Sequence, residues 1–243
     1  MTHKDLPSEI RKQAVDYLSA SAKAVLGGVP FAGSLLVELL GNVIPNQRMD
    51  RIARFAAALE NRIGVLEGAD IRSDLSDESF NEIIEESLHQ AVRSTSQERI
   101  NYLASLAANS LSNDEISNSE HRHLLRILGE ISDVEVIWLR SLVSSCIGKP
   151  DSFRTTHEST LKPVSAYLGS TQAELDKHAL QESYMIHLAT LGLVKRALKL
   201  DRNKSPELNA TTKDFVYGSP SITPLGRILL RTIGLAPEST ENG

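Results

Sequence analysis

The sequence predicts a mainly α-helical fold: a multi-helix bundle followed by a C-terminal winged-helix-like unit with a small β-hairpin. Apolar residues recur every three or four positions along most of the chain, which is the helical period. Aromatic residues make up only 5% of the sequence, and this favours helix packing over a β-sandwich. The helical period breaks in only one region, HLATLGLVKRALKL at 187–200 and FVYGSPSITPLGRILLRTIG at 215–234.

The composition is that of a globular protein, because 41% of the 243 residues are hydrophobic and 23% are charged. The net charge of −5 argues against a protein that coats nucleic acid. A lone cysteine, Cys146, excludes an intramolecular disulfide and a multi-cysteine zinc site, and we interpret it as a small buried hydrophobe. Residues 1–16 are polar and charged, unlike a signal peptide, so we expect a cytoplasmic protein, with a location peripheral to the inner membrane as the alternative.

The first predicted domain, residues 1–67, contains a helix at 6–23 and an apolar segment at 24–45. Glu38 is the only charged residue between Ala24 and Arg48, but two prolines and four glycines argue against a stable membrane span. We interpret the segment as a buried hairpin or broken helix. The alternative is a membrane or partner contact, whose candidate residues are Phe31, Leu35, Leu36, Val37, Leu39 and Leu40.

Another helix follows Pro45, with apolar residues spaced by 3, 4, 3, 4 and 3 positions. Such a seam suits a bundle helix, and it also suits a homo-oligomer formed through the same face. Arginines on the other faces are interpreted as solvated, with a patch for nucleic acid or anionic lipid as the alternative. The seam residues are Met49, Ile52, Ala56, Leu59, Ile63 and Leu66.

The second predicted domain, residues 68–150, begins with an acidic connector at 68–78. Capping boxes, in which a Ser or Thr and a Glu three residues later satisfy each other's helix-end N–H groups, predict helix starts at Ser79 and Ser132. Further helices are expected from about Ser96 and over 119–131. The expected inward residues are Phe80, Ile83, Ile84, Leu88, Ala91 and Val92; Ile100, Leu103, Ala107 and Leu111; Leu124, Ile127 or Leu128, and Ile131; and Val134, Ile137, Trp138, Leu142 and Cys146.

The last predicted domain, residues 161–236, follows a polar boundary at 149–160. Helical signals at 161–168 precede a third capping box, Thr171 with Glu174, whose helix runs to Leu191. LVKRALKL at 193–200 is a strand candidate, with a polar loop at 201–214 and a return strand at 215–217. Thr223 is expected to cap a closing helix with Pro224 at its first position, and residues 237–243 are expected to form a disordered tail.

Residues 161–236 contain ten basic and six acidic residues, a net charge of +4 that suits phosphate contact. The candidate nucleic-acid-binding residues are Lys195, Arg196, Lys199, Arg202 and Lys204. The preceding helix, however, carries Glu174, Asp176 and Glu182, where a helix that reads bases would carry Arg, Lys, Asn or Gln. The charge pattern therefore favours a structural or partner-binding role over DNA binding.

No catalytic, cofactor or metal motif is found. The chain has no Gly-rich phosphate loop and no GxGxxG or G-x-S-x-G pattern. His121 and His123 would lie about 200° apart on a helix, so they do not form a metal pair. We therefore predict no catalytic residues, no cofactor and no enzyme activity.

Two stretches resemble the abortive-infection alpha family of bacterial phage-resistance proteins. The first is ERINYLASLAANSL with HRHLLRILGEISDVEVIWLRSLV, and the second is HLATLGLVKRALKL with ITPLGRILLRTIG. The resemblance covers about 95–235 and implies a helical bundle with a wing-like C-terminal unit; it carries over no catalytic residue. The leading hypothesis is a non-enzymatic phage-defence protein that acts through a protein partner or membrane contact. The alternatives are a winged-helix DNA-binding regulator and a phage- or plasmid-encoded scaffolding protein.

Overall fold

The computed structural model describes residues 46–65, 78–111, 117–143, 152–167, 169–201, 204–208 and 215–236. Several predictions from sequence lie outside these residues. They are the helix at 6–23, the apolar segment 24–45 with its candidate contacts, the connector up to residue 77, the position of Cys146 and the tail 237–243.

The chain divides into two compact units, and the division differs from the domains expected from sequence. Unit 1 runs to Gly129 and includes Thr232–Gly234, whereas unit 2 contains Glu130–Arg231 and the residues after Gly234. The boundary in the chain therefore lies just before residue 130, at the end of a helix, instead of in the polar stretch 149–160.

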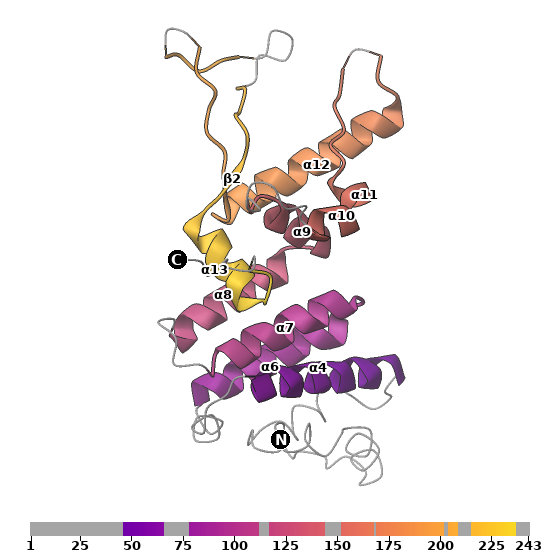
Figure 1. The fold of residues 1–243 in the computed structure, drawn as a ribbon, viewed down its shortest axis with the longest axis vertical. Coiled ribbons are helices and arrows are strands. Elements are labelled where there is room, and N and C mark those ends of the chain that lie inside the picture. Colours follow the sequence, from indigo (N-terminus) through magenta and orange to yellow (C-terminus); the bar gives the residue numbers. More distant parts are fainter. Residues whose placement is uncertain are drawn as a thin grey trace, which may run out of the picture. The chain divides into compact units, whose positions relative to one another are not determined.

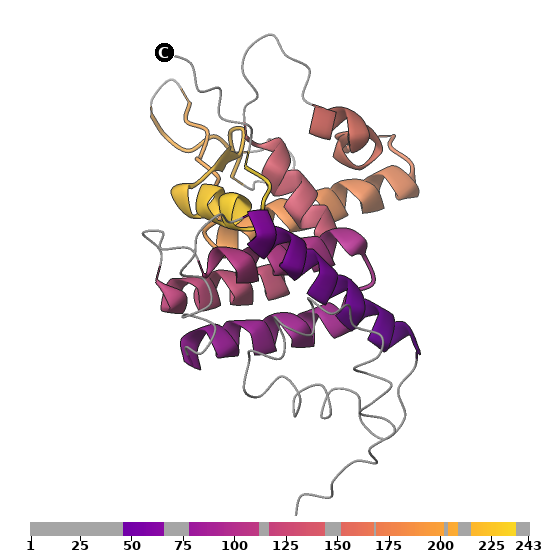
Figure 2. The ribbon, with the colours of Figure 1, turned by 60° about the horizontal axis from the view of Figure 1, so that its bottom comes forward.

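Unit 1 is helical. Helices α4 (Asn46–Val65), α6 (Glu78–Arg93) and α7 (Gln97–Asn109) pack against one another in all three pairs, and α8 is Asn118–Glu130 (Figures 1 and 2). The inward faces predicted for α6, α7 and α8 are confirmed, since all of those side chains are buried. They form a continuous apolar core, which is the main stabilising contribution in a helical domain.

The seam of α4 belongs to this core. Ile52, Ala56 and Leu59 are at most 1% exposed, and α4 contacts both α6 and α7. Phe55, which the 3–4 spacing left out, is also fully buried, because a core-facing helix buries a wider stripe than a two-position seam. These side chains are occupied within unit 1, so a homo-oligomer formed through them would have to displace that packing.

The starts of two helices in unit 1 differ from the predictions. Helix α6 begins at Glu78, so Ser79 lies inside its first turn and is not the cap residue. Helix α8 is opened by an unpredicted capping box, in which the Glu120 carboxylate accepts from the Ser117 N–H at 2.6 Å and from its hydroxyl at 2.9 Å. The pattern S-x-x-E is present in the sequence at 117–120, but it lies in a polar stretch and is not among the predicted helix starts.

Unit 2 contains five helices among its described residues and a two-stranded antiparallel sheet. The helices are α9 (Asp133–Ser141), α10 (Ser152–Thr156), α11 (Glu158–Leu161), α12 (Gln172–Thr190) and α13 (Pro224–Thr232). Strand β1 (Val194–Lys195) pairs with β2 (Ser221–Ile222), with Val194 opposite Ile222. The mainly helical fold and the small antiparallel hairpin agree with the prediction, whereas the winged-helix character of the last unit stays a prediction.

Helix α9 starts with the predicted capping box, but the predicted inward face is wrong. Val136 and Leu139 are fully buried, whereas Val134, Ile137, Trp138 and Leu142 are half-buried. The difference has a local cause. The Glu135 carboxylate turns inward, where one oxygen caps the helix at Ser132 and the other lies 2.6 Å from Nδ1 of His187 on α12.

Around residue 160 the structure reverses the prediction. Most of the stretch expected to be a polar boundary, 149–160, is helical, and most of the stretch expected to be helical, 161–168, is not. Short helices occupy 152–161, and 162–167 is neither helix nor strand, with extended backbone at Lys162. Pro163 disfavours the helical conformation of the residue before it, and Lys162 has φ −64° and ψ 111°. The extended segment is held to α12 by Gln181, whose amide accepts from the Val164 N–H and donates to the Lys162 carbonyl, both at 2.9 Å.

Two short motifs meet where the hairpin joins the helices. The Thr223 N–H donates to the Leu193 carbonyl at 3.0 Å, and its hydroxyl donates to the Gly192 carbonyl at 2.7 Å. The same hydroxyl accepts from the Gly226 N–H, as expected of an N-cap. The L-G-L-V sequence after α12 is thereby joined to the T-P-L-G sequence that opens α13.

Candidate docking site on the hairpin

The segment from Val194 to Ile222, called the hairpin below, extends well beyond its two short strands (Figure 1). Isolated bridges continue the pairing, with Leu198 opposite Tyr217, Leu200 opposite Pro206 and Leu208 opposite Phe215. The predicted return strand at 215–217 is thus represented by two bridges, while the regular strand lies at Ser221–Ile222. The interruption coincides with Gly218 and Pro220; proline has no N–H to donate to a ladder.

The bridges place five large apolar side chains on one face of the hairpin. Residues directly opposite in antiparallel strands project to the same side, and so do residues two apart in one strand. Applied to the three bridges, this rule gives one group, called the hairpin face below: Leu198, Leu200, Leu208, Phe215 and Tyr217.

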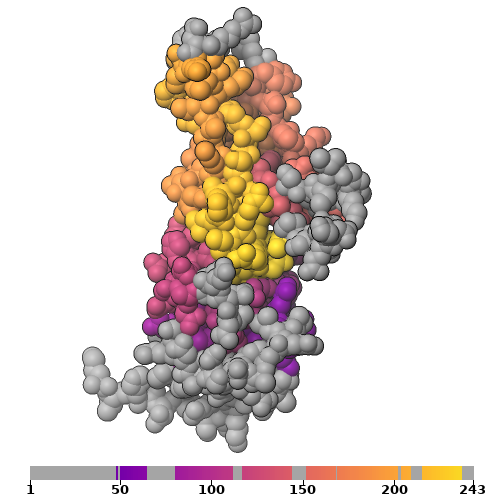
Figure 3. Space-filling model, turned by 60° about the vertical axis from the view of Figure 1, so that its left-hand side comes forward, coloured from indigo at the N-terminus to yellow at the C-terminus, as the bar shows by residue number. Residues whose placement is uncertain are grey.

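The hairpin face is exposed. Its members are between 41% and 53% accessible to solvent, with Leu200 at 53% and Tyr217 at 43%. At the base of the hairpin, Val194 and Ile222 are only 3% and 9% exposed. The base of the hairpin is therefore packed in unit 2, whereas its outer part carries an uncovered apolar face; the described residues of the hairpin are orange to yellow in Figure 3.

The five basic residues proposed for nucleic acid do not form a single free cluster. The Arg196 guanidinium donates to Glu182 at 2.9 Å and lies 4.5 Å from the centre of the Tyr217 ring. Lys199 pairs with Glu207 at 3.1 Å. Lys195 and Lys204 are exposed and pair with no carboxylate among the described residues, and Arg202 lies outside those residues.

Helix α12, which precedes the hairpin, presents an acidic and apolar outer surface. Leu175, Leu180 and Ile186 are 38%, 55% and 53% exposed. Glu174 and Asp176 also lie on the exposed part, where Asp176 accepts a hydrogen bond from Gln172. This surface offers bases and phosphates few of the donors that they require.

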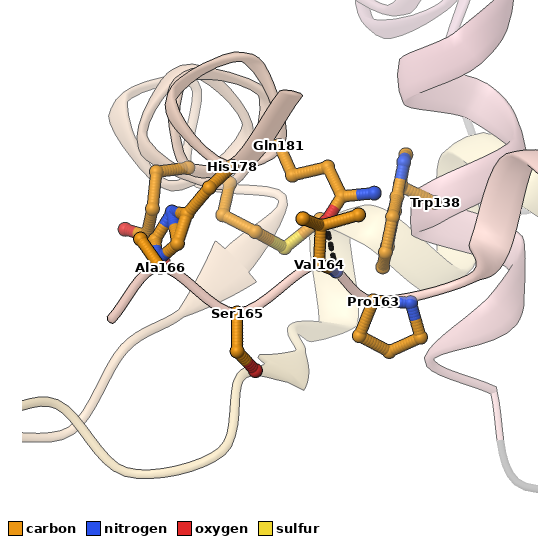
Figure 4. A pocket seen from close by; sticks show the side chains of 9 residues that line it. Trp138, Pro163, Val164, Ser165, Ala166, His178 and Gln181 are labelled. Atoms are coloured by element: carbon orange, nitrogen blue, oxygen red, sulfur yellow. Dashed lines mark hydrogen bonds between the residues drawn. The ribbon is translucent and has the colours of Figure 1, made fainter. Parts of the chain in front are cut away.

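A pocket of about 270 Å³ lies beside α12 in unit 2 (Figure 4). Two of its polar groups are engaged, because Gln181 bonds to the backbone of Lys162 and Val164 and Glu182 pairs with Arg196, whereas the buried Trp138 Nε1 has no hydrogen-bond partner among the described residues. Figure 4 shows the Ser165 side chain pointing away from His178, so these two residues do not form a nucleophile–base pair. The lining residues are Trp138, Pro163, Val164, Ser165, Ala166, His178, Gln181, Glu182 and Met185.

The remaining histidine and carboxylate contacts are structural. His121 is buried, with Nδ1 3.1 Å from the Ser117 carbonyl, while His123 is exposed, as their spacing predicted. Glu135 and His187 join α9 to α12. Across the described ranges, no group of three or more His, Cys, Asp or Glu side chains is arranged to hold a metal ion. The hairpin face is therefore the strongest candidate site, and what it offers is non-covalent binding.

Sequence reasoning identified the charges of the hairpin but missed its apolar face. The signal was present as alternation, L-K-L at 198–200 and F-V-Y at 215–217, which is typical of strands with one apolar side. The β-bridges were needed to show that these apolar residues share one face of the hairpin.

In comparisons with known proteins, no family model, no curated protein and no solved structure matches the chain. Among the helices whose residues are described, none has both the length and the apolar character needed to cross a membrane.

Proposed function

We propose that this chain is a non-enzymatic phage-defence protein of the abortive-infection type, which acts by binding a partner through the hairpin face. The resemblance of residues 95–235 to that family supports the biological role. The molecular part of the proposal depends on one observation: five large apolar side chains lie on one face of the hairpin and are about half exposed.

Exposure of this kind suits a binding surface better than a structural element. Single exposed apolar residues are common, but contiguous groups of them mark interaction sites. The hairpin is held together by backbone bonds at its centre, since Lys199 donates to Val216, Val216 donates to Glu207 and Glu207 donates to Lys199. A partner would therefore meet a surface that is already folded, which lowers the cost of ordering on binding.

Phage challenge of bacteria that carry the gene tests this proposal. The triple variant Leu200→Ser, Leu208→Ser, Phe215→Ser should lose protection while protein abundance and Tm stay unchanged. Ile186→Ser on α12 is the matched control, because Ile186 and Leu208 are 53% and 52% exposed. Full protection by the triple variant, in a strain that the wild type protects, would refute docking through the hairpin face.

A winged-helix DNA-binding regulator is the second candidate. It is favoured by the order α12, hairpin with β1 and β2 at its base, and α13, and by the exposed Lys195 and Lys204. The acidic and apolar surface of α12 counts against base reading in the major groove. Gel-shift titration decides: binding that weakens steeply with salt and is lost in Lys195→Glu, Lys204→Glu would support a regulator. Absence of a shift at low salt would eliminate it.

A further inference from the structure

We propose that the partner of the hairpin face is the surface of an anionic lipid bilayer, into which the hairpin inserts its apolar side chains. This inference rests on the proposed function, because it names the class of partner for the same docking site. It assigns a membrane contact to a part of the chain far in sequence from the apolar segment 24–45.

The first argument is the segregation of charge. Residues 194–222 contain six basic and three acidic residues, a net charge of +3. The whole chain has 26 basic and 31 acidic residues, so the remainder has 20 and 28, a net charge of −8. The exposed apolar group thus lies in a positive segment of a negative protein, and this charge is complementary to an anionic surface.

The second argument is the chemistry of the face. Leucine and phenylalanine side chains enter the boundary between headgroups and acyl chains, whereas tyrosine remains at the level of the headgroups. The hairpin face places Leu200, Leu208 and Phe215 toward its outer end and Tyr217 nearer the base, where Arg196 lies over its ring. The face therefore offers both apolar and amphipathic contacts to a bilayer interface. Asp201 and Lys204 lie in the turn beyond Leu200, so the hairpin would lie along the membrane surface and would not enter it tip first.

The third argument is the state of the backbone. Polar groups that enter a bilayer must already be hydrogen-bonded, because the hydrocarbon region offers them no partner. At the centre of the described hairpin, the Lys199 N–H donates to the Val216 carbonyl at 2.8 Å, and the Lys199 carbonyl accepts from the Glu207 N–H at 2.8 Å. The Val216 N–H donates to the Glu207 carbonyl at 2.9 Å. Shallow insertion leaves these groups paired, whereas the N–H groups of the five face residues donate to no carbonyl among the described residues. Their partners at a membrane would be water and headgroups, so insertion stops at the headgroup boundary.

Nucleic acid, the other common anionic partner, fits this surface less well. Three of the five side chains are leucines, which neither stack on bases in the manner of aromatic rings nor contact phosphates. Two of the five basic candidates are already engaged with Glu182 and Glu207. The positive charge that remains suits dispersed headgroups better than an ordered phosphate track.

Flotation of the full chain with vesicles tests the inference. One set of vesicles contains phosphatidylcholine alone, and the other contains phosphatidylcholine with phosphatidylglycerol. The wild type should float with the anionic vesicles, and added salt should weaken its binding. Lys195→Gln and Lys204→Gln should each lower the partition coefficient by about fivefold, which corresponds to the contribution of one lysine at an anionic surface.

The apolar contribution is tested in the same assay. Leu200→Ser, Leu208→Ser, Phe215→Ser should reduce partitioning at least about tenfold, whereas the matched Ile186→Ser should leave it unchanged. Circular dichroism melting of each variant confirms that the fold is retained. Because the substituted side chains are exposed, their melting curves should superimpose on that of the wild type.

Each alternative outcome separates this inference from the function on which it rests. If no vesicle binds the wild type but the triple variant still loses phage protection, lipid is excluded and a protein partner remains. Loss of self-association in the triple variant during sedimentation equilibrium, without lipid binding, assigns the face to a second copy and also overturns the inference. If lipid does not bind and the triple variant protects fully, both proposals fail.

Discussion

The Thr223 hydroxyl donates to the carbonyl oxygen of Gly192 at 2.7 Å, although the two residues are 31 positions apart. This bond closes the hairpin at its base and fixes the start of α13 beside the end of α12. Gly192 has a φ of 73°, a conformation that favours glycine after a helix end. L-G-L-V and T-P-L-G, the two short motifs in the second stretch of the family resemblance, are therefore joined in a single structural element.

Gly226→Ala should destabilise unit 2. A Cβ at residue 226 would lie 2.5 Å from the Leu193 carbonyl oxygen and 2.8 Å from Cγ1 of Ile222. Overpacking of this kind costs about 1–3 kcal/mol, measurable as a lower urea midpoint. Gly64→Ala on α4 is the control, because a Cβ there meets nothing within 4 Å. It should be neutral or stabilise by up to about 1 kcal/mol, and equal effects at both sites would contradict the close approach.

Glu135→Ala should cost about 1–3 kcal/mol of unfolding free energy, because it removes a helix cap and a buried partner of His187. A double-mutant cycle with His187→Ala measures the contact itself. We expect a coupling of at least about 0.5 kcal/mol. Strict additivity of the two substitutions in chemical denaturation would show that the 2.6 Å contact contributes nothing.

The capping boxes of α8 and α12 predict a loss of stability in acid. Hydrogen bonds from the Ser117 backbone N–H, and then from its hydroxyl, lower the pKa of Glu120. The backbone N–H and then the hydroxyl of Thr171 lower the pKa of Glu174 in the same way. At a pH between the lowered pKa of the folded state and the ordinary pKa of the unfolded state, the unfolded chain binds more protons than the folded chain. The stabilisation that these carboxylates give the fold is therefore complete above the unfolded pKa of about 4.3. It is lost as the pH falls through the folded pKa.

Calorimetric melting as a function of pH checks this sign. Glu120→Gln and Glu174→Gln should lower Tm near neutral pH and should make the fall of Tm in acid shallower than in the wild type. Ser117→Ala and Thr171→Ala remove a donor to the same carboxylates and should act in the same direction. A steeper acid limb in either glutamine variant would contradict the assignment.

Arg196→Ala should loosen the hairpin without unfolding the unit. The substitution removes the ion pair with Glu182 and the contact with the Tyr217 ring, together worth about 1 kcal/mol. Amide hydrogen exchange at Lys199 and Val216 should accelerate by about fivefold. Lys199→Ala is the comparison, since its ion pair with Glu207 is exposed on both sides and should change exchange much less. Unchanged exchange in Arg196→Ala would show that the guanidinium does not hold the hairpin.

The helices of unit 1 could be predicted from sequence because their cores follow the helical period. Every side chain expected to face inward on α6 is buried, as are those of α7 and α8. The period fails on α9, where a carboxylate, Glu135, lies inside and the buried face moves to Val136 and Leu139. A pattern that treats every glutamate as solvent-facing cannot detect an inward carboxylate whose partner is 52 positions away.

Unit 2 depends on contacts between distant residues, and these were less accessible from sequence. Gln181 holds the backbone of residues 162–164, so a segment with helical residues becomes extended. The hairpin was predicted from its turn and strand residues, but its apolar face required the pairing of Leu198 with Tyr217 and Leu208 with Phe215. Alternation indicates that a strand has two sides, but it does not indicate which side remains uncovered.

The gradient of burial along the hairpin has an evolutionary consequence. Val194 and Ile222 at the base are buried in unit 2, whereas the exposed side chains of the hairpin face contribute little to its stability. Substitutions at the outer positions can therefore accumulate with little penalty to folding. The tip can diversify rapidly under selection while the base is conserved, so that variants with different targets retain one scaffold.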